Sequence, residues 1–324
     1  MSRRRVVITG IGLASPIGND LESVSDALKQ GRHGIRHRDD WVHIKDLAAR
    51  LTAEVTDLDL SKRWPRKATR SMGRVAMLAT YASEKAIEDA GLPLDSLRTG
   101  RVGLAYGSTQ GSSGAHEEWA KRVFSESGMR GVQSSDYLKL MSHTCPANLA
   151  LHFGIRGRVI STCSACVSSS QAIGFGYEAV RAGAQDVMIC GGAEEMHFTH
   201  VGTFDVMYAA SRRYNDHPEL SPRPFDAARD GLVVGEGAGT LVLEDYERAL
   251  ARGAKIHAEI IGFATTCDGS HMTSPSTEGM ADTMRAALID ARIEPSRIGY
   301  INAHATGTEV GDICESRAVH QIFG

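Results

Sequence analysis

Short apolar runs alternate with amphipathic helical stretches along almost the whole chain, and this alternation constrains the fold more than any other feature. The runs predicted as strands are Val6–Gly10, Val102–Tyr106, Val159–Ser161, Asp186–Cys190, Gly239–Leu243, Ala258–Phe263 and Tyr300–Ala303. The stretches predicted as helices are Leu21–Lys29, Met72–Ala90, Val167–Ala182 and Met280–Ala291. Strands that alternate with helices predict an α/β fold whose sheets are covered by helices.

Two distant segments carry the same local pattern. Residues 86–106 and residues 287–303 each give a helix ending in Asp-Ala, a short turn containing proline, and an apolar run. Such units are common in α/β proteins, so this pair alone does not establish a duplication. If it does reflect one, each half would have about 200 residues, an ordinary domain size, and the complete protein about 400.

The composition excludes several classes of protein. Of the 324 residues, 42% are apolar and 23% are charged, and 36 Lys and Arg against 39 Asp and Glu give a formal charge of −3. These values are typical of a globular protein and not of a disordered, collagenous or coiled-coil one. The near-neutral balance argues against a dedicated nucleic-acid binder. No apolar run has the length of a membrane helix.

The N-terminal stretch and the cysteines predict a cytoplasmic protein. Residues 6–17 follow three arginines, as the core of a signal peptide would, but glycines and a proline interrupt them and no small-x-small cleavage site follows. We therefore predict a buried strand there. The six cysteines are scattered through a large chain, which predicts reduced thiols rather than a disulfide framework.

The clearest chemical motif is residues 158–180, where an apolar run passes through Cys163 and Cys166 into a helix. A cysteine at a helix entrance lies near the positive end of the helix dipole, which favours the thiolate that a nucleophile needs. Small neighbours permit a tight elbow. On this segment alone, a buried structural pair and a Cys-x-x-Cys redox pair stay open. A zinc site is not favoured, because no second such pair and no matching histidine pair exist.

Residues 300–316 form the second motif. His304 follows an apolar run and enters a turn that contains Thr306 and Thr308, and the acids Asp312 and Glu315 follow as a helix begins. A histidine in such a turn can hydrogen-bond a substrate oxygen, and the two hydroxyls can bind a polar linker. A structural histidine fits this local pattern equally well.

Two glycine-rich segments could indicate nucleotide binding, but each lacks part of the pattern. Residues 235–239 lack the lysine of a phosphate loop and lead into a strand rather than a helix, so we predict a tight turn packed against other backbone. Gly10 and Gly12 follow a strand as in a dinucleotide fingerprint, yet the third glycine is missing. A Rossmann-type oxidoreductase is therefore a minor alternative.

A basic run covers residues 61–74, which carry six Lys and Arg and no acid. One interpretation is a solvated helix entrance. The other is a docking surface for an acidic partner, because a local basic patch on a net-acidic protein steers association.

Five motifs in this order resemble the β-ketoacyl-[acyl carrier protein] synthases, the condensing enzymes of fatty acid and polyketide synthesis, and the details are similar to an elongating-type subgroup. The motifs are RRRVVITGIGLASPIGN, SACVSSSQAIG, RPFDAARDGLVVGEGAG, DGSHMTSP and NAHATGTEVGD. The resemblance implies a thiolase-like fold of two pseudo-repeated halves in five layers, αβαβα. We expect an N-terminal half over 1–250 with the nucleophile and an incomplete C-terminal half over 251–324 with the histidine. It also implies a homodimer without cofactor or metal.

The resemblance assigns roles to single residues. Cys166, and not Cys163, matches the nucleophile that accepts the acyl group, and His304 matches the first active-site histidine. Glu315 matches a buried structural acid. The residues that match the binding site for the pantetheine arm are Thr273, Thr306 and Thr308. Those that fall in the region docking the acidic acyl carrier protein are Arg66, Lys67 and Arg70.

The resemblance also implies the reaction, in which Cys166 takes an acyl group that is then condensed, with decarboxylation, with malonyl carrier protein. The family's second histidine, its lysine and a glycine-rich loop would lie beyond Gly324, so we expect the native protein to extend further. Ala305 stands where the family usually has glycine, Leu232 where many members have phenylalanine, and Gln110 leaves the acyl preference open. The alternative is a non-condensing thiolase-fold partner subunit of a heterodimeric synthase, against which the presence of Cys166 argues.

Overall fold

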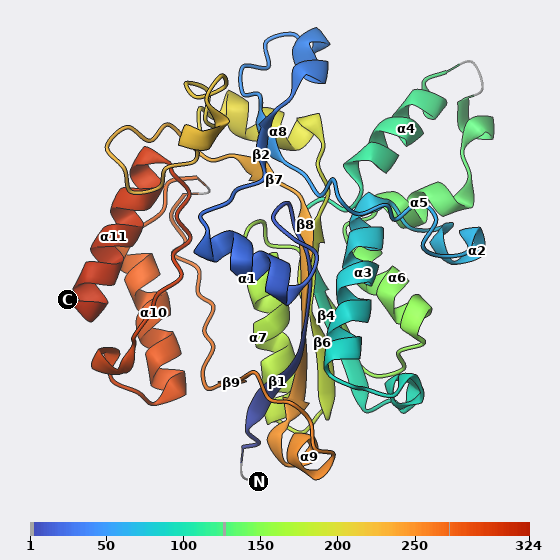
Figure 1. Cartoon of the computed structure of the whole chain (residues 1–324), viewed down its shortest axis with the longest axis vertical. Helices are drawn as coiled ribbons and strands as arrows, with labels where there is room; N and C mark the ends of the chain where they lie inside the picture. The colour runs from blue at the N-terminus through green and yellow to red at the C-terminus, as the bar shows by residue number, and fades with distance from the viewer. Residues whose placement is uncertain (1–2, 126–127, 272) are drawn as a thin grey trace. The chain divides into compact units, whose positions relative to one another are not determined.

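A computed structural model describes residues 3–125, 128–271 and 273–324 of the chain (Figure 1). These residues form two compact units, each assembled from separate stretches of sequence. The first comprises the chain up to Gly34, Glu54–His197 and Gly235–Ile260. The second comprises Ile35–Ala53, Phe198–Val234 and Ile261–Gly324.

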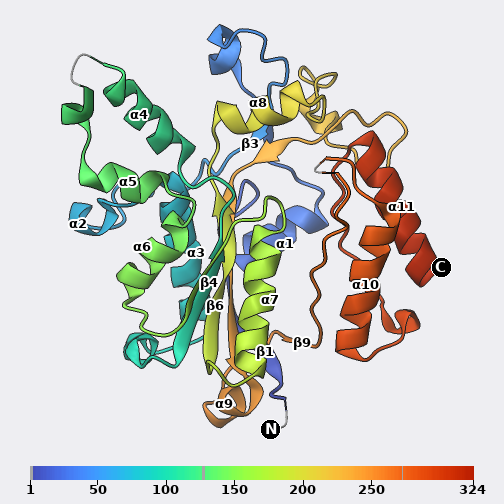
Figure 2. The ribbon, with the colours of Figure 1, turned by 180° about the vertical axis from the view of Figure 1, so that it is seen from behind.

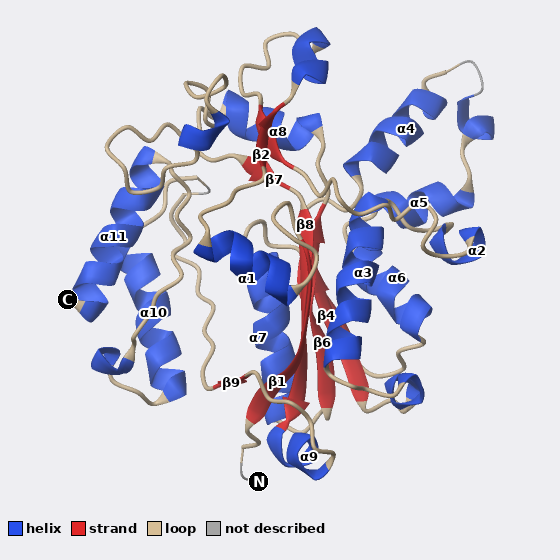
Figure 3. Cartoon of the chain, viewed as in Figure 1, coloured by secondary structure: helices blue, strands red, loops and turns tan. Residues whose placement is uncertain are grey.

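A six-stranded mixed sheet is the centre of the first unit, with the strand order β5-β4-β6-β8-β1-β9 (Figure 3). Its strands are β1 Val6–Ala14, β4 Val102–Gly107, β5 Val159–Thr162, β6 Val187–Glu194, β8 Gly237–Asp245 and β9 Ala258–Ile260. Strands β5, β4 and β6 run parallel, whereas β8 pairs antiparallel with both β6 and β1, and β9 pairs antiparallel with β1. The parallel strands end at the same edge, which is where α/β proteins place their binding sites.

Helices cover both faces of this sheet, with α3 and α7 on opposite sides (Figures 1 and 2). The helices of this unit are α1 Leu21–Lys29, α2 Arg66–Thr69, α3 Arg74–Asp89, α4 Ser113–Val123, α5 Ser134–Leu140, α6 Thr144–Phe153, α7 Ser168–Arg181 and α9 Tyr246–Ala251. A Cβ atom at Gly10 or Gly12 would overlap carbonyl oxygens of α3. These glycines therefore let α3 pack directly on β1, with Leu78 and Ala82 fully buried between helix and sheet.

The second unit has a small three-stranded sheet and a helical pair. The sheet has the order β2-β3-β7, formed by Ile35–His37, Leu51–Ala53 and Val234–Gly235. The helices are α8 Phe198–Val206, α10 Thr277–Ala291 and α11 Glu309–Phe323, of which α10 and α11 pack side by side. Asp205 of α8 stabilises the loop before β3 by accepting the backbone N–H groups of Ala48 and Ala49 at 2.8 and 3.0 Å.

Most of the predicted elements are confirmed. All four predicted helices form, and six of the seven predicted strands form with ends shifted by a few residues. The strand predicted at Tyr300–Ala303 is wrong, because the structure has no strand there. Its pattern is apolar, but no described neighbour hydrogen-bonds with it as a strand, and the side chain of Tyr300 is 79% exposed.

The repeated sequence pattern corresponds to a repeated packing arrangement. Asp89 at the end of α3 accepts the N–H of Ile11 at 3.0 Å, and Asp290 near the end of α10 accepts the N–H of Phe263 at 3.1 Å. The residue before each donor, Gly10 or Gly262, lies against the last turns of the same helix. Each unit therefore contains one copy of the same join between a helix and the segment before it, as two pseudo-repeated halves require. That segment is strand β1 in the first unit and is not a strand in the second.

Candidate active site

Cys166 lies on a sharp elbow between the edge strand β5 and helix α7. The turn passes through Ala165, whose φ of 50° is in the left-handed region that residues other than glycine rarely adopt. Helix α7 begins at Ser168, two residues after Cys166, and Val167 at its N-cap offers no side-chain cap. The elbow predicted from the sequence is confirmed, and Cys166 is exposed on it near the positive end of the helix dipole.

Two hydroxyl groups hold this elbow in place. Ser168 Oγ accepts the N–H of Ser164 at 2.8 Å and donates to the carbonyl of Ala165 at 2.7 Å. Thr162 Oγ1 donates to the carbonyl of Ser168 at 2.8 Å, which ties the end of β5 to the first turn of α7. The small polar residues of the motif are therefore what fixes the direction of the turn.

Cys166 lines a cavity of about 250 Å³ within the first unit. Its walls are small residues at the ends of β4, β6 and β8, together with Ser168 and Ser169, and Glu194 is the largest side chain among them. A Cβ atom at Gly107 or Gly192 would come within 2.8 Å of Ser168 or Ser169, so glycines are required for α7 to approach the sheet here. Gly237, Ala238 and Gly239 supply another wall at the start of β8. The tight turn predicted for residues 235–239 is wrong, because β7 ends at Gly235 and β8 begins at Gly237. The predicted close approach to other backbone is present, since a Cβ atom at Gly237 would lie 2.7 Å from the Ala14 carbonyl oxygen.

The six cysteines form no disulfide, and their environments separate them into different classes. Cys145 and Cys190 are fully buried, and burial raises the pKa of both thiols above the ordinary value. Cys163 and Cys166 are exposed on the elbow, and Cys163 Sγ donates to the carbonyl of Thr109 at 3.2 Å. Of this pair, only Cys166 lines the cavity.

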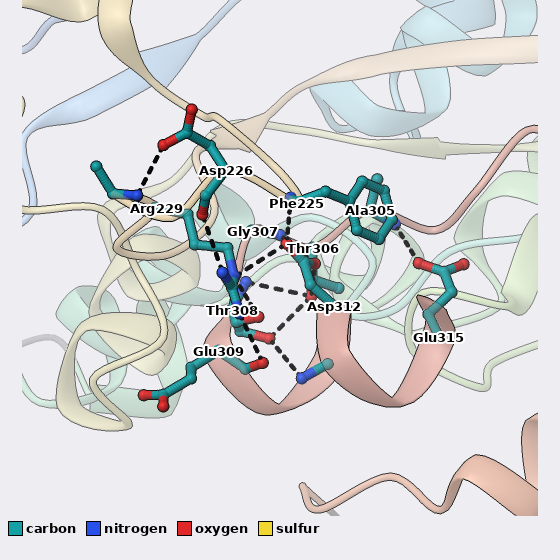
Figure 4. Close-up of polar contacts among 12 residues, drawn as sticks. Phe225, Asp226, Arg229, Ala305, Thr306, Gly307, Thr308, Glu309, Asp312 and Glu315 are labelled. Atoms are coloured by element: carbon teal, nitrogen blue, oxygen red, sulfur yellow. Dashed lines mark hydrogen bonds and ion pairs between the residues drawn. The ribbon is translucent and has the colours of Figure 1, made fainter. Parts of the chain in front are cut away.

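In the second unit, His304 lies in a loop whose backbone is hydrogen-bonded to Glu315. The two carboxylate oxygens of Glu315 accept the backbone N–H groups of His304 and Ala305 at 2.6 and 2.8 Å. Figure 4 shows the contact between Glu315 and Ala305. Glu315 is buried on α11, and Ala305 has a φ of 52°. The glutamate thus fixes the backbone on which the His304 side chain is mounted.

Asp312 is the second anchor of this loop, and sequence reasoning did not assign it a role. It accepts the N–H of Gly307 at 3.0 Å and that of Phe225 at 2.7 Å, and it pairs with Arg229 at 3.2 Å (Figure 4). Arg229 also donates to the carbonyls of Thr308 and Glu309. The sequence did show an acid in the first turn of a predicted helix. It could not show the partners of Asp312, because Phe225 and Arg229 lie far away in sequence.

The two threonines of the loop hydrogen-bond each other at 2.9 Å between their hydroxyl oxygens. Thr308 is the N-cap of α11, where its hydroxyl accepts the N–H of Gly311 at 3.3 Å. Thr306 lies 3.4 Å from Asp312 through its hydroxyl. Thr273 is in the exposed loop before α10, where its N–H donates to His271 Nδ1 at 3.2 Å.

Arg66, Lys67 and Arg70 are exposed at α2, and none of them forms an ion pair with a described residue. They line one side of a cavity of about 640 Å³, and Lys139 of α5 lines it too. Lys139 lies 4.0 Å from the carboxylate of Asp136, whereas the charges of Arg66, Lys67 and Arg70 are not compensated by a described acid. This concentration of positive charge attracts acidic groups.

The residues that the structure describes contain neither a cluster of metal ligands nor a membrane-spanning helix. No group of three or more His, Cys, Asp or Glu side chains among them is arranged to hold a metal ion. None of the described helices is both long enough and apolar enough to cross a membrane.

Comparison with known proteins identifies the family. The N-terminal domain model of β-ketoacyl synthases matches residues 3–249, and the C-terminal domain model of the same family matches residues 257–324. The chain belongs to the β-ketoacyl synthase family. Its resemblance to this family, inferred from five sequence motifs, is therefore confirmed.

Similar proteins include 3-oxoacyl-[acyl-carrier-protein] synthase 1 of Haemophilus influenzae, 39% identical over 99% of this chain and 78% of that protein. The crystal structure of a β-ketoacyl synthase from Burkholderia phymatum has a TM-score of 0.95 and 48% identity, over 99% of this chain and 78% of that one. A chain from a type II polyketide synthase acyl-carrier protein in complex with its ketosynthase has a TM-score of 0.88 and 28% identity, with coverage of 100% and 78%. The expected thiolase-like α/β fold of β-ketoacyl synthases is thereby confirmed.

Proposed function

We propose that this chain is a β-ketoacyl-[acyl-carrier-protein] synthase, an acyltransferase of fatty acid synthesis or of a related polyene or polyketide pathway. The observation that carries the proposal is the position of Cys166, exposed on the elbow between β5 and α7 and lining a cavity of small residues. Membership of the β-ketoacyl synthase family over nearly the whole chain supports the proposal.

The first step is transfer of an acyl group to Cys166. The thiolate attacks the thioester carbonyl of the acyl donor, the new carbon–sulfur bond forms, and the pantetheine thiolate leaves and takes up a proton. The start of α7 favours the thiolate form of Cys166, because the helix dipole places partial positive charge there. The small cavity walls leave space for the acyl group.

The second step forms a carbon–carbon bond. Malonyl carrier protein loses carbon dioxide, and the electron pair of the broken bond passes to the enolate of the thioester. The resulting carbanion attacks the acyl group on Cys166, and the Cys166 thiolate leaves. We assign His304 as a donor to the thioester oxygen that becomes negative, because positioned donors stabilise such charge strongly.

The loop around His304 is suited to positioning. Glu315 fixes the backbone of His304 and Ala305, and it is assigned as the structural acid of the site. Thr306 and Thr308 present hydroxyl groups from the same loop, and with Thr273 they are proposed to hold the amides of the pantetheine arm. Asp312 and Arg229 support this loop without a role in the chemistry.

The partner is proposed to be an acyl carrier protein that docks at Arg66, Lys67 and Arg70. The uncompensated positive charge of this wall supports the assignment, because it would attract an acidic carrier. We also propose that the chain acts in the cytoplasm as a homodimer. Its functional division would lie at residues 1–250 and 251–324, close to the boundary between the two matched family models.

Acylation of single cysteine variants tests the nucleophile. Cys166→Ala abolishes the acyl-enzyme, whereas Cys163→Ala, the comparison three residues away, largely preserves it. The measurement is intact mass and peptide mapping after incubation with an acyl thioester or a cerulenin-type electrophile. A label on Cys163 overturns the assignment, and a wild-type Cys166 that is never acylated favours a non-condensing subunit.

Charge reversal tests the docking surface. Reversing Arg66, Lys67 and Arg70 raises KM for carrier-bound substrate and spares a small pantetheine thioester that makes no docking contact. The difference shrinks with added salt, because exposed charges are screened over about 10 Å at 0.1 M ionic strength. Equal losses on both substrates would show that the patch is structural.

A further inference from the structure

Glu194 is an acid inside the cavity of Cys166 that the reaction proposed above does not use. It ends β6, lines the cavity, and is largely shielded from solvent. Burial raises the pKa of its carboxyl group, and the charge of the neighbouring Glu195 raises it further. An acid beside a nucleophilic thiolate requires an explanation, because a negative charge there would oppose thiolate formation.

The contacts of Glu194 lead from the sheet to the elbow. Its carboxylate oxygen Oε1 accepts the backbone N–H of Thr109, and Oε2 lies 3.5 Å from Ser108 Oγ, which donates to it. The carbonyl of Thr109 in turn accepts the thiol of Cys163 at 3.2 Å. Cys163 begins the elbow, three residues before Cys166. The backbone of one residue, Thr109, is therefore held by Glu194 at its N–H and by Cys163 at its carbonyl.

We propose that Glu194 is a positioning residue, which through Thr109 and Cys163 holds the elbow that presents Cys166 to its cavity. This inference rests on the proposed function, because that function makes Cys166 the nucleophile. The contacts of Glu194 do not depend on it. It also gives Cys163 a purpose that is distinct from nucleophilic attack, namely to anchor the start of the elbow.

The role of Glu194 requires an acceptor oxygen rather than a charge. Burial raises the pKa of Glu194, whereas the hydrogen bonds from Thr109 and Ser108 lower it. Either form of the carboxyl group can accept the Thr109 N–H. Glutamine has the same shape and the same acceptor oxygen, so it is the conservative replacement for the role.

Glu195 provides a matched control. It is the next residue and also buried, but its carboxylate accepts Val75 N–H and Ser112 Oγ at 3.0 Å and Gly114 N–H at 2.9 Å. Among the described residues, neither oxygen hydrogen-bonds to Thr109 or to the elbow, and Glu195 does not line the cavity. Its removal should loosen the start of α3 and α4 and leave Cys166 unaffected.

The experiment measures how fast iodoacetamide alkylates Cys166 in the full chain, by peptide mass spectrometry, together with the kinetics of acyl transfer. We expect Glu194→Ala to slow alkylation about tenfold and to lower kcat with little change in KM. A tenfold change corresponds to about 1.4 kcal/mol, the size of one lost hydrogen bond in a buried site. Glu194→Gln should restore the rate to within about twofold, because it keeps the acceptor.

Cys163 variants test the other end of the same connection. Cys163→Ala should slow alkylation about threefold, since a thiol is a weak donor, and Cys163→Ser should recover part of the loss. The double variant with Glu194→Ala should be no slower than Glu194→Ala alone, because the two side chains act through the backbone of the same residue, Thr109. Cys163 is exposed, so these variants test the proposal even if Glu194→Ala does not fold.

Several results would overturn the proposal. These are an unchanged rate in Glu194→Ala or in Cys163→Ala, an equal loss in Glu194→Gln, additive losses in the double variant, and an equal loss in Glu195→Ala. Failure of the proposed function gives a different result. In that case Cys166 responds to the Glu194 and Cys163 variants in alkylation as expected, but wild-type protein transfers no acyl group.

Discussion

The two copies of the join between a helix and the segment before it make the same local contacts, but the two helices that they hold, α3 and α10, are buried to very different extents. In the first unit, Asp89 and Gly10 join β1 to α3, and 10 of the 16 residues of α3 are buried. In the second, Asp290 and Gly262 join an extended segment to α10, and Ala281 is the buried residue among its 15. A local motif therefore fixes how a helix ends against a strand, whereas burial depends on a wide sheet such as the one under α3.

The largest expected effect comes from filling the two glycine positions. Gly10→Ala should lower the free energy of unfolding by about 3 kcal/mol or more, because the new methyl group overlaps the Ala86 carbonyl in a close-packed core. Gly262→Ala should cost less, about 1 kcal/mol, because its Cβ atom would stay 2.7–2.8 Å from the nearest atoms of Ala291 and Ala287, and α10 is mostly not buried. Urea unfolding of both variants measures the difference. Equal losses would contradict the interpretation that packing around α3 and α10 differs.

Removing the two aspartates should give an intermediate effect. Asp89→Ala leaves the Ile11 N–H without its acceptor and also releases His257 Nε2, which lies 2.7 Å from Asp89, so we expect a loss of about 2 kcal/mol. Asp290→Ala removes the acceptor of the half-buried Phe263 N–H, and we expect about 1 kcal/mol.

Asparagine keeps an acceptor oxygen at each position and serves as the matched control for this pair. Thermal unfolding of the four variants gives the comparison. A larger loss for Asp290→Ala than for Asp89→Ala would show that the second join contributes more to stability than its burial suggests.

The smallest expected effect concerns Ala165 and Ala305, which occupy the left-handed region next to Cys166 and His304, respectively. In this region the Cβ atom of each alanine is crowded by its own backbone, which destabilises the folded state. Glycine would relieve this crowding, but it would also increase the conformational entropy of the unfolded chain. We expect Ala165→Gly and Ala305→Gly each to raise the free energy of unfolding by about 0.5 kcal/mol. Chemical denaturation of each variant measures this change, and the double variant checks that the two effects add. A loss of stability at either position would show that the backbone there is not strained.

Sequence reasoning predicted the parts of the molecule that depend on nearby residues. Helix α1 was predicted with its exact bounds, and the elbow around Cys166 follows from a strand, small residues and a helix in direct succession. The failed strand at Tyr300–Ala303 has the right apolar pattern, but a strand also requires a hydrogen-bonding neighbour, which no local pattern supplies.

The supporting contacts of both loops could not be predicted in the same way. Asp312 meets Phe225, a residue 87 positions away, and Glu194 meets Thr109, 85 positions away. Nothing in the sequence near Glu194 indicates that its carboxyl group would face a nucleophile. Glu194 meets Thr109 because β6 and β4 are neighbours in the sheet, and Asp312 meets Phe225 because α11 packs beside a distant loop. Both arrangements become visible only when the chain is folded.

The buried thiols of Cys145 and Cys190 can report local unfolding of the protein interior. Each is fully enclosed, and its raised pKa means that the native thiol is both inaccessible and unreactive. An alkylating reagent can therefore reach them only during excursions that separate α6 or β6 from their neighbours. The rate at which these two cysteines are labelled can be compared with the faster rate at the elbow. The comparison would measure how often the interior of a working enzyme is exposed, without any engineered probe.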